Sequence, residues 1–432
     1  MIVLPMYIFQ KMLPMLLDNT NSININIPSY FIPMISRPRG TRDFTPEEMR
    51  RRRWLESRMR EVFESYGYEE IATPTFEHLD LFTLKSGEGV IDETYAFEDK
   101  SGRKLALRPE LTAPVMRFYV ERFQMETKPL KFYYFGNCFR YDRPQKGRYR
   151  EFWQFGCEMI GSDRPEAIAE LISTAYSVLR QSGLKSIVVR VGNLDILRRF
   201  LDGIGARDAE IMRLIDKKEF GELERRMGEE EYGKFMDFIA SNNLDNIEFE
   251  EAERMREIVS YLEDFGVPYS IDLSIARGLD YYVGVVFEMD APRLGAEKQL
   301  CGGGEYNLVP LLGGRKIPTS GFAIGFDRTL LALEMEGFDF SEERKRVYVA
   351  YMEGMLREAI KVARKLRGEG IITEMDIMGR SIRKSLDYAN KKGIKNVIIV
   401  APDEWKEGKI VLKNMETGEQ ENVSIEEVME KI

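Results

Sequence analysis

Two β-rich runs constrain the fold more than any other feature of this sequence. KFYYFGNCFRY (131–141) and YREFWQFGCEMIG (149–161) are rich in aromatic residues and flank a short polar connection. Side chains alternate between the two faces of a strand. In the second run, one face carries the nearly all-apolar set Glu151, Trp153, Phe155, Cys157 and Met159. The runs therefore predict an antiparallel hairpin with one face in a core and a long connection.

The opposite face of the second run carries Arg150, Phe152, Gln154 and Glu158. A solvated polar face is one interpretation. However, Gln154 and Glu158 flank Gly156, where a backbone can approach a ligand closely. The pattern therefore favours a binding wall, in which the carboxylate recognises a cation or a hydrogen-bond donor.

The connection between the runs is basic, although the chain has a formal net charge of −9. Its cations are Arg140, Arg143, Lys146, Arg148 and Arg150, against the single acid Asp142. An acidic total argues against a protein that coats DNA, but it leaves room for a nucleic-acid substrate bound at one patch. Guanidinium groups bind phosphate bidentately. A base could stack on Phe152, with Arg328 of GFDR as the candidate for its other face.

The scarcity of histidine and cysteine excludes several kinds of chemistry. His78 is the one histidine, so metal sites with several histidines are excluded. A Ser-His-Asp triad would have to use His78 itself. We interpret it as a structural or surface residue. The three cysteines show no C-x-x-C spacing, which argues against a disulfide framework or a cysteine-rich zinc site. A reduced intracellular protein is expected, with catalysis by carboxylates, arginines and a metal-bound nucleotide.

Short signals organise the rest of the chain. Thr45-Pro46-Glu47-Glu48 begins a helix that ends at Gly67, and YEEIATPTFE (68–77) is interpreted as a strand interrupted by Pro74. The later expected elements are a helix at 165–183, a strand at 187–192, helices at about 195–268, strands within 267–289, a glycine-rich turn at 302–304, and a strand into a helix at 321–333. From about 346 the pattern is β-α-β-α-β, typical of a small α/β domain. The basic residues of its second helix form either a solvated face or a nucleic-acid contact.

Two further motifs suggest ligand contacts. In RGLDYY (277–282), Arg277 precedes a strand on which Tyr281 and Tyr282 are expected to point to opposite faces. LRPELT (107–112) is interpreted as a strand-to-helix turn that presents a carboxylate and a hydroxyl to an ammonium group. No Walker A sequence is present, and Gly302-Gly303-Gly304 lacks the third glycine of a dinucleotide fingerprint. A bound nucleotide would therefore be held by arginines.

The N-terminal residues are apolar but do not form a membrane signal. Prolines at 5 and 14 break the first 17 residues, which are too short for a span, and no basic region precedes them. We expect no membrane partner, and we expect residues 1–36 to be a poorly structured extension. A biological start at Met34 is the alternative to a genuine extension.

Taken in order, these motifs resemble the class II aminoacyl-tRNA synthetases, and specifically the histidyl-tRNA synthetase family. The resembling segments are PRGTRDF (38–44) for the N-terminal signature, YGYEEIATP for motif 1, FRYDRPQKGRYREFWQFGCEMIG for motif 2, GFAIGFDR for motif 3, and RGLDYY and CGGGEY (301–306) for the histidine-specific motifs. The resemblance covers about residues 37–430. The chain departs from the family pattern at Asp142, where glutamate is usual, and at Glu305 and Asn307, where arginine and aspartate are usual.

The resemblance implies an α+β fold. A class II antiparallel-sheet catalytic domain would span 37–340, with a helical insertion at about 195–268. An anticodon-binding α/β domain would span 346–432. The implied activity is that of a cytoplasmic, homodimeric histidine–tRNA ligase, which uses ATP, Mg²⁺ and L-histidine to form histidyl-adenylate and then charges tRNA(His). The alternatives are a class II synthetase for another amino acid, a non-catalytic RNA-binding or scaffold protein, and the regulatory paralogue of ATP phosphoribosyltransferase, which typically lacks the C-terminal domain and motif arginines.

The resemblance also implies residue roles. The catalytic arginines would be Arg140, Arg277 and Arg328. ATP would contact Arg140, Arg148, Phe152 and Arg328. Histidine would contact Glu110, Leu111, Thr112, Gln154, Glu158, Tyr281, Tyr282 and Tyr306, with Glu158 and Tyr282 bonding the imidazole nitrogens. The tRNA acceptor end would meet Arg143, Lys146 and Arg148. Such a site works by positioning and electrostatics and needs no protein nucleophile.

Overall fold

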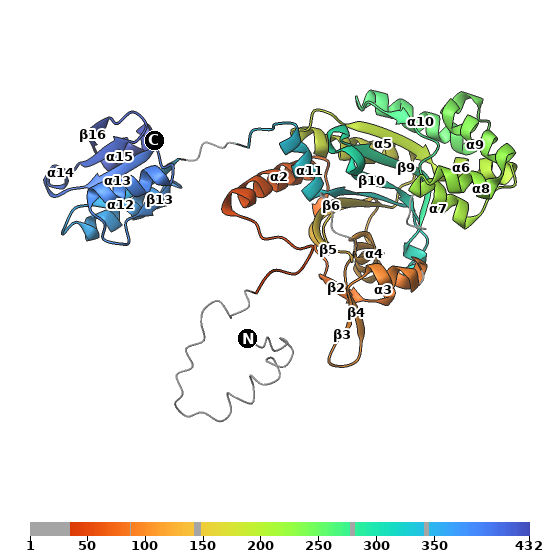
Figure 1. The fold of residues 1–432 in the computed structure, drawn as a ribbon, viewed down its shortest axis with the longest axis horizontal. Helices are drawn as coiled ribbons and strands as arrows, with labels where there is room; N and C mark the ends of the chain where they lie inside the picture. Colours follow the sequence, from red (N-terminus) through yellow and green to blue (C-terminus); the bar gives the residue numbers. More distant parts are fainter. Residues whose placement is uncertain (1–34, 87, 142–147, 277–280, 341–344) are drawn as a thin grey trace, which may run out of the picture. The chain divides into compact units, whose positions relative to one another are not determined.

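The structure is a computed structural model that describes residues 35–432 except 87, 142–147, 277–280 and 341–344 (Figure 1). The chain forms two compact units that divide between Phe338 and Asp339. The extension expected at 1–36 lies almost wholly outside the described residues. Arg143, Lys146 and Arg277 lie outside them as well.

The first unit is built on an eight-stranded sheet in the order β1-β5-β6-β11-β10-β9-β7-β8. Its outermost pairs, β1·β5 and β7·β8, are parallel, and the pairs between them are antiparallel. The expected antiparallel-sheet α+β fold is therefore confirmed. The strands are β1 Glu69–Glu70, β5 Leu130–Phe139, β6 Glu151–Ile160, β7 Val188–Asn193, β8 Ser270–Ile271, β9 Tyr282–Asp290, β10 Gln299–Tyr306 and β11 Thr319–Gly325.

The predicted hairpin forms the second and third strands of this sheet. β5 and β6 pair antiparallel over ten residues each, with Tyr134 opposite Gly156 and Cys138 opposite Phe152. The predicted apolar face is buried under helix α2 (Pro46–Ser65), whose Phe63 ring stacks 5.2 Å from the ring of Tyr133. Helix α2 begins with the predicted capping box, because Thr45 and Glu48 bond each other's backbone N–H groups.

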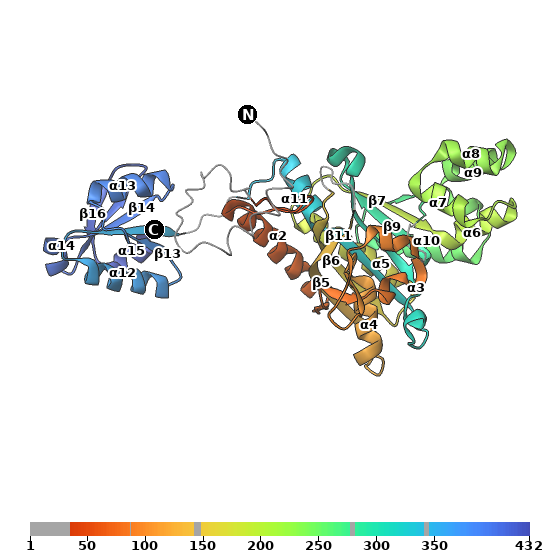
Figure 2. The ribbon, with the colours of Figure 1, turned by 60° about the horizontal axis from the view of Figure 1, so that its bottom comes forward.

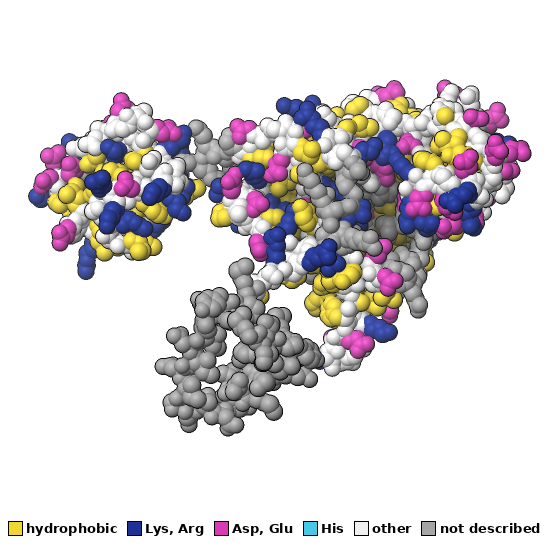
Figure 3. Space-filling view, in the orientation of Figure 1, with side chains coloured by type: hydrophobic (Ala, Val, Ile, Leu, Met, Phe, Trp, Pro, Cys, Tyr) yellow, Lys and Arg dark blue, Asp and Glu magenta, His cyan; other side chains and the backbone are white. Residues whose placement is uncertain are grey.

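Other helices surround the sheet (Figures 1 and 2). Those outside the inserted region are α3 Asp80–Ser86, α4 Thr112–Arg122, α5 Pro165–Gln181 and α11 Phe326–Met335. The inserted helices, between β7 and β8, are α6 Leu194–Gly203, α7 Ala209–Lys217, α8 Phe220–Met227, α9 Glu229–Ser241 and α10 Glu250–Asp264. Short 3-10 helices are η2 Glu88–Glu93, η3 Leu244–Asn246, η4 Pro292–Glu297 and η5 Val309–Leu312. Figure 3 shows acidic side chains gathered at the outer end of the inserted helices, near α8 and α9.

Two local predictions are wrong. Residues 302–304 are not a turn, because they lie within β10, where an added Cβ on Gly303 would lie 2.5 Å from the Gly321 carbonyl oxygen. The glycines permit close packing of strands instead. Residues 68–77 do not form one interrupted strand. β1 joins the large sheet, whereas β2 (Phe76–His78) joins a separate sheet with β4 (Lys104–Leu107) and β3 (Ala96–Glu98). Between β1 and β2, the guanidinium group of Arg108 donates hydrogen bonds to the carbonyls of Thr73 and Pro74.

The second unit has a five-stranded sheet in the order β13-β12-β14-β15-β16. The predicted parallel β-α-β-α-β core is confirmed, and an antiparallel hairpin, β15-β16, extends it. Helix α13 covers one face, and α12 and α15 cover the other (Figure 2). The elements are β12 Arg346–Tyr351, α12 Leu356–Gly368, β13 Ile372–Met375, α13 Ile382–Lys391, β14 Asn396–Val400, α14 Pro402–Lys406, β15 Ile410–Asn414, β16 Gln420–Val423 and α15 Ile425–Lys431. Within the described ranges, no helix is long and apolar enough to cross a bilayer.

Candidate active site

The face of the large sheet opposite α2 is hollowed into a cavity of about 600 Å³. Its walls come from the β5-β6 hairpin, β9, β10, β11, helix α3, and the N-terminal ends of α4 and α11. The predicted site residues that line it are Glu110, Leu111, Thr112, Arg140, Arg148, Phe152, Gln154, Tyr281, Tyr282 and Arg328. Residues more than two hundred positions apart in sequence thus meet around one cavity.

Glu158 lies fully buried on β6, on the cavity side of the sheet. The hydroxyl of Tyr134 donates to its Oε1 at 2.9 Å, and that of Tyr306 donates to its Oε2 at 2.5 Å. Burial raises the pKa of this carboxyl to about 8, against the opposing effect of the hydroxyls that bond it. At neutral pH Glu158 therefore holds a proton that it can share with a basic ligand. The ordinary imidazole pKa of about 6.5 suits such a partner.

Three tyrosine rings lie together beside this carboxyl. The ring centroids of Tyr281 and Tyr282 are 5.1 Å apart, and those of Tyr281 and Tyr306 are 5.8 Å apart. The prediction that Tyr281 and Tyr282 point to opposite faces is wrong, because β9 begins at Tyr282 and strand alternation does not reach Tyr281. Both rings line the cavity and form an apolar wall.

Gly156 has a different role from the predicted one. An added Cβ there would lie 2.4 Å from the hydroxyl oxygen of Tyr134 and 2.6 Å from the carbonyl oxygen of Phe322. The backbone gap at Gly156 is thus filled by Tyr134, which approaches Glu158, and not by a ligand. Sequence reasoning missed Tyr134, although the hairpin register places it opposite Gly156.

A second carboxylate lies at the start of α4. The carboxylate oxygens of Glu110 accept hydrogen bonds from the backbone N–H groups of Thr112 at 2.6 Å and Ala113 at 2.9 Å. Burial raises the pKa of Glu110, and these N–H groups oppose the effect. Gln154 lines the same cavity from β6. A fixed carboxylate and an amide on facing elements can bind an ammonium group, which fits the interpretation of 107–112 as a strand-to-helix turn.

Arginines and an aromatic ring form the other end of the cavity. The guanidinium carbon of Arg140 lies 5.2 Å from the Phe152 ring centroid, and its Nε donates to the Pro109 carbonyl at 2.9 Å. Arg328, in the first turn of α11, donates to the Gln299 carbonyl at 3.1 Å. Two guanidinium groups and one ring lining the same space can bind phosphate and a base.

The start of α11 is fixed by a buried aspartate that sequence reasoning missed. Asp327 accepts from Arg52 at 2.5 Å, from the backbone N–H of Trp153 at 2.8 Å, and pairs with Arg42 at 2.7 Å. These contacts join α2, β6 and the segment before α2 at the residue next to Arg328. The signal available in the sequence was an acid adjoining an arginine at the start of an apolar helix.

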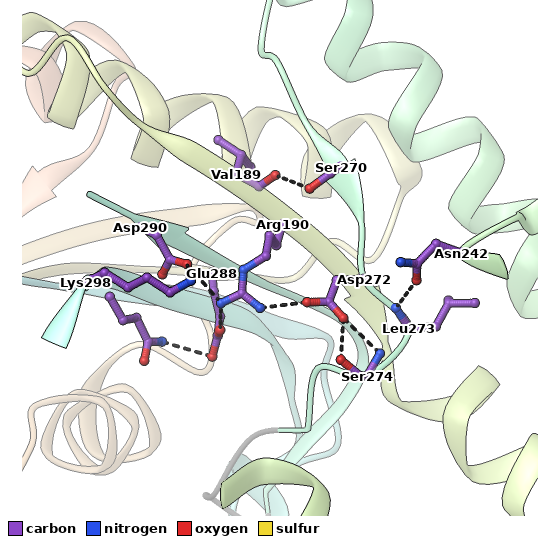
Figure 4. Close-up of polar contacts among 11 residues, drawn as sticks. Val189, Arg190, Asn242, Ser270, Asp272, Leu273, Ser274, Glu288, Asp290 and Lys298 are labelled. Carbon is purple, nitrogen blue, oxygen red and sulfur yellow. Dashed lines mark hydrogen bonds and ion pairs between the residues drawn. The ribbon is translucent and has the colours of Figure 1, made fainter. Parts of the chain in front are cut away.

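A second ionic cluster is centred on Arg190 (Figure 4). Arg190 on β7 donates to Asp272 at 2.6 Å, to Glu288 at 2.6 Å and to Asp290 at 3.1 Å. Lys298 also pairs with Asp290, at 3.3 Å. The cluster ties the segment after β8 to strand β9.

This cluster reaches the cavity through Glu288. The Gln299 side chain donates to the Glu288 carboxylate at 3.0 Å, and the Gln299 carbonyl accepts from Arg328. Glu288 and Gln299 both line the cavity, and so does Asp216 from inserted helix α7. Sequence reasoning missed all three, although a charged residue within an apolar strand, as Glu288 is, signals a paired or functional role.

The antiparallel sheet, the hairpin with its basic connection and the arginine at the start of α11 define the catalytic unit of a class II aminoacyl-tRNA synthetase. The sequence model described as Histidyl-tRNA synthetase matches residues 40–329, and that described as Anticodon binding domain matches residues 346–432. The chain belongs to the histidyl-tRNA synthetase family.

Curated relatives agree with this assignment. A histidine–tRNA ligase of Archaeoglobus fulgidus is 49% identical over 411 residues, which covers 91% of this chain and 98% of the relative. A histidine–tRNA ligase of Methanosarcina acetivorans is 45% identical over 414 residues, covering 92% and 98%. Among solved structures, apo histidyl-tRNA synthetase from S. aureus aligns with a TM-score of 0.70 at 32% identity, covering 92% of this chain and 99% of that one.

Proposed function

We propose that this aminoacyl-tRNA synthetase is a histidine–tRNA ligase. It activates L-histidine with ATP to histidyl-adenylate and pyrophosphate, and transfers the histidyl group to the 3′ end of tRNA(His). The observation that carries the assignment is Glu158, a buried carboxyl whose pKa of about 8 suits an imidazole partner and which lies, bonded by Tyr306, on the same face of β6 as the cavity-lining Gln154. A site built to bond a polar side chain discriminates strongly against ligands that leave its groups unpaired.

Each end of the cavity has a proposed task. Glu158, with Tyr306 and Tyr282, binds the imidazole. The α-ammonium group is held by Glu110, Thr112 and Gln154, next to Leu111 and Tyr281. Phe152 stacks on adenine, Arg328 binds adenine and the γ-phosphate, and Arg140 binds the α-phosphate. Arg277, which lies outside the described residues, is proposed to stabilise the negative charge that develops between the carboxylate and the α-phosphate.

Mg²⁺ fits this arrangement because it is usually held by one or two carboxylates together with substrate phosphates. Glu288 supplies a carboxylate to the cavity at the arginine end. When bound, the ion would neutralise phosphate charge during the in-line attack. The residues of the chain position the phosphates and the attacking carboxylate.

The remaining assignments rest on the family. We propose that residues 37–340 form the catalytic domain, with the helical insertion at about 195–268, and that 346–432 bind the anticodon. Arg143, Lys146 and Arg148 would meet the tRNA acceptor end, and Arg148 would also contact ATP. A cytoplasmic homodimer is proposed.

The regulatory paralogue of ATP phosphoribosyltransferase is not favoured. A solved structure titled as an ATP phosphoribosyltransferase regulatory subunit/histidyl-tRNA synthetase, from Bacillus halodurans, aligns with a TM-score of 0.73 at 24% identity, which indicates a shared fold alone. This chain keeps Arg140, Arg328 and the second unit, and its curated relatives are ligases.

Amino-acid-dependent ATP–pyrophosphate exchange tests the proposal. The full-length protein is assayed with Mg²⁺ and each of the twenty amino acids, followed by charging of tRNA(His). Exchange with histidine alone is expected. Absence of exchange with every amino acid, in a protein shown to be folded, would contradict the proposal and favour a regulatory role.

A further inference from the structure

A β-bulge interrupts strand β9 next to the tyrosine cluster. Strand β10 pairs Gly304 with Val286, but pairs the next residue, Glu305, with Val283. Two residues of β9, at 284 and 285, are therefore extra at this point. Gly284 adopts a φ of 53°, a left-handed conformation that glycine accommodates without steric cost. Such a bulge leaves backbone N–H groups without partners in the ladder.

Two carboxylates bind the N–H groups of the bulge. The N–H of Gly284 donates to Asp195 Oδ2 at 3.0 Å, and the N–H of Val285 donates to Glu305 Oε2 at 2.7 Å. Asp195 comes from inserted helix α6 and is itself paired with Arg198 at 3.0 Å. The two backbone N–H groups of the bulge therefore find their hydrogen-bond acceptors on side chains, one of which comes from the insertion.

An arginine from the insertion also holds the second carboxylate. Arg254, on α10, donates to both oxygens of Glu305, at 2.9 Å and 2.7 Å, and to the Asp163 carbonyl at 2.6 Å. This is the bidentate geometry that arginine supplies and lysine cannot. Arg198 Nη2 donates to the Tyr282 carbonyl at 3.1 Å. Arg198 therefore contacts β9 at Tyr282, and Arg254 contacts β10 at the residue before Tyr306.

The insertion also holds the chain before residues 277–280. Asn242, which ends α9, accepts a hydrogen bond from the N–H of Leu273 at 3.1 Å (Figure 4). Contacts from the insertion therefore lie on both sides of that segment, at Leu273 and at Tyr282. The start of β9 is positioned by the inserted helices as well as by its own sheet.

We propose that Arg254 and Glu305 form a positioning pair for the amino-acid end of the cavity. Glu305 adjoins Tyr306, whose hydroxyl bonds Glu158, and Tyr306 is paired with Tyr282 across the strands. Holding the bulge positions Tyr306 against Glu158 and keeps the Tyr282 ring beside Tyr306, with centroids 6.3 Å apart. The pair explains why an acid at 305, where the family usually has arginine, suits this chain. The inference rests on the proposed histidine activation and deepens it.

The test compares variants in ATP–pyrophosphate exchange. Arg254→Met is expected to raise KM for histidine about tenfold, with KM for ATP changed less than about twofold. Glu305→Gln keeps an acceptor for the Val285 N–H, so a smaller rise is expected. The double variant should be no worse than Arg254→Met, because the two residues act through one contact.

Two further variants separate positioning from general stability. Arg254→Lys keeps the charge but not the fork, and should give a histidine KM between those of wild type and Arg254→Met. Arg199→Met is the matched control, because Arg199 pairs with Glu251 inside the insertion at 2.7 Å without touching the sheet. It is expected to leave both KM values unchanged. Thermal melting of each variant accompanies the kinetics.

Each outcome decides the question. A wild-type histidine KM in Arg254→Met, with wild-type exchange intact, overturns the positioning pair. Equal rises in the KM values for histidine and ATP in Arg254→Met, together with a lower melting temperature, would also overturn the positioning pair. In that case the pair would stabilise the fold without positioning the amino-acid end of the cavity. A wild-type protein without histidine-dependent exchange would instead overturn the proposed function, and the pair's role with it.

Discussion

Replacing Glu158 with glutamine tests whether this carboxyl is protonated in the folded protein. Burial raises its pKa from 4.5 to about 8. Between these values the folded state keeps a proton that the unfolded chain has released. Each pH unit in this interval therefore lowers the free energy of unfolding by about 1.4 kcal/mol. The loss is absent below about pH 4.5 and reaches about 5 kcal/mol above pH 8.

Glutamine carries no charge at any of these pH values and can still bond the two tyrosine hydroxyls. The variant lacks the loss of stability that wild type suffers as pH rises. The difference in free energy of unfolding, Glu158→Gln minus wild type, should therefore grow by about 1.4 kcal/mol per pH unit between roughly pH 5 and 7.5. Urea unfolding across this range, followed by tryptophan fluorescence, measures the difference; Trp54 and Trp153 report on the first unit, and the signal of Trp405 in the second unit is common to both proteins. Parallel stability curves for the two proteins would refute the reasoning.

Tyr306→Phe provides a matched comparison. The hydroxyl of Tyr306 lowers the pKa of Glu158, so its removal should raise that pKa further and extend the pH interval of declining stability upward. In activity, Glu158→Gln should lower kcat/KM for histidine by about 10–100-fold, because glutamine has no proton to share with the imidazole and the charge-assisted hydrogen bond is lost. KM for ATP should change little.

Three other substitutions test the surroundings of the site. Gly321→Ala would place a Cβ 1.9 Å from Glu158 Oε2, so a lower melting temperature and loss of histidine-dependent exchange are expected; an unchanged variant would contradict the packing. Asp327→Asn removes the counter-ion of Arg52 and should lower the free energy of unfolding by about 3 kcal/mol in urea titrations. A difference below about 1 kcal/mol would argue against a buried charge pair there. Phe152→Leu should raise KM for ATP several-fold in exchange kinetics and leave KM for histidine near wild type, whereas equal rises would contradict base stacking.

Local patterns predicted much of the fold. The period-two alternation in 149–161 correctly placed an apolar face under α2 and a second face, with Phe152 and Gln154, toward the cavity, because alternation depends only on the geometry of an extended chain. The capping residues at 45–48 correctly began α2, because a cap is a contact within one helical turn. Where alternation was applied beyond a strand, at Tyr281, it failed.

Sequence analysis did not identify the residues whose role depends on partners far away along the chain. Tyr134 and Tyr306 reach Glu158 from two other strands, and Asp327 bonds side chains from a helix 275 positions away. The glycines at 302–304 were expected in a turn because their composition suits one. Their close contacts with neighbouring strands appear only when the sheet is assembled.

By itself, the sequence determined which strand presents Phe152 and Gln154 to the cavity, which arginines line that cavity, and the family to which the chain belongs. Those properties follow from the order and spacing of residues along the chain. The tertiary structure decided how Glu158 is protonated, because burial and the hydroxyls of Tyr306, Thr112 and Tyr134 set its pKa. It also decided that Glu305 pairs with Arg254, since the inserted helix meets the bulge only in the folded chain. The strength of these electrostatic interactions depends on burial and on the distance between the groups, and the order of residues alone specifies neither.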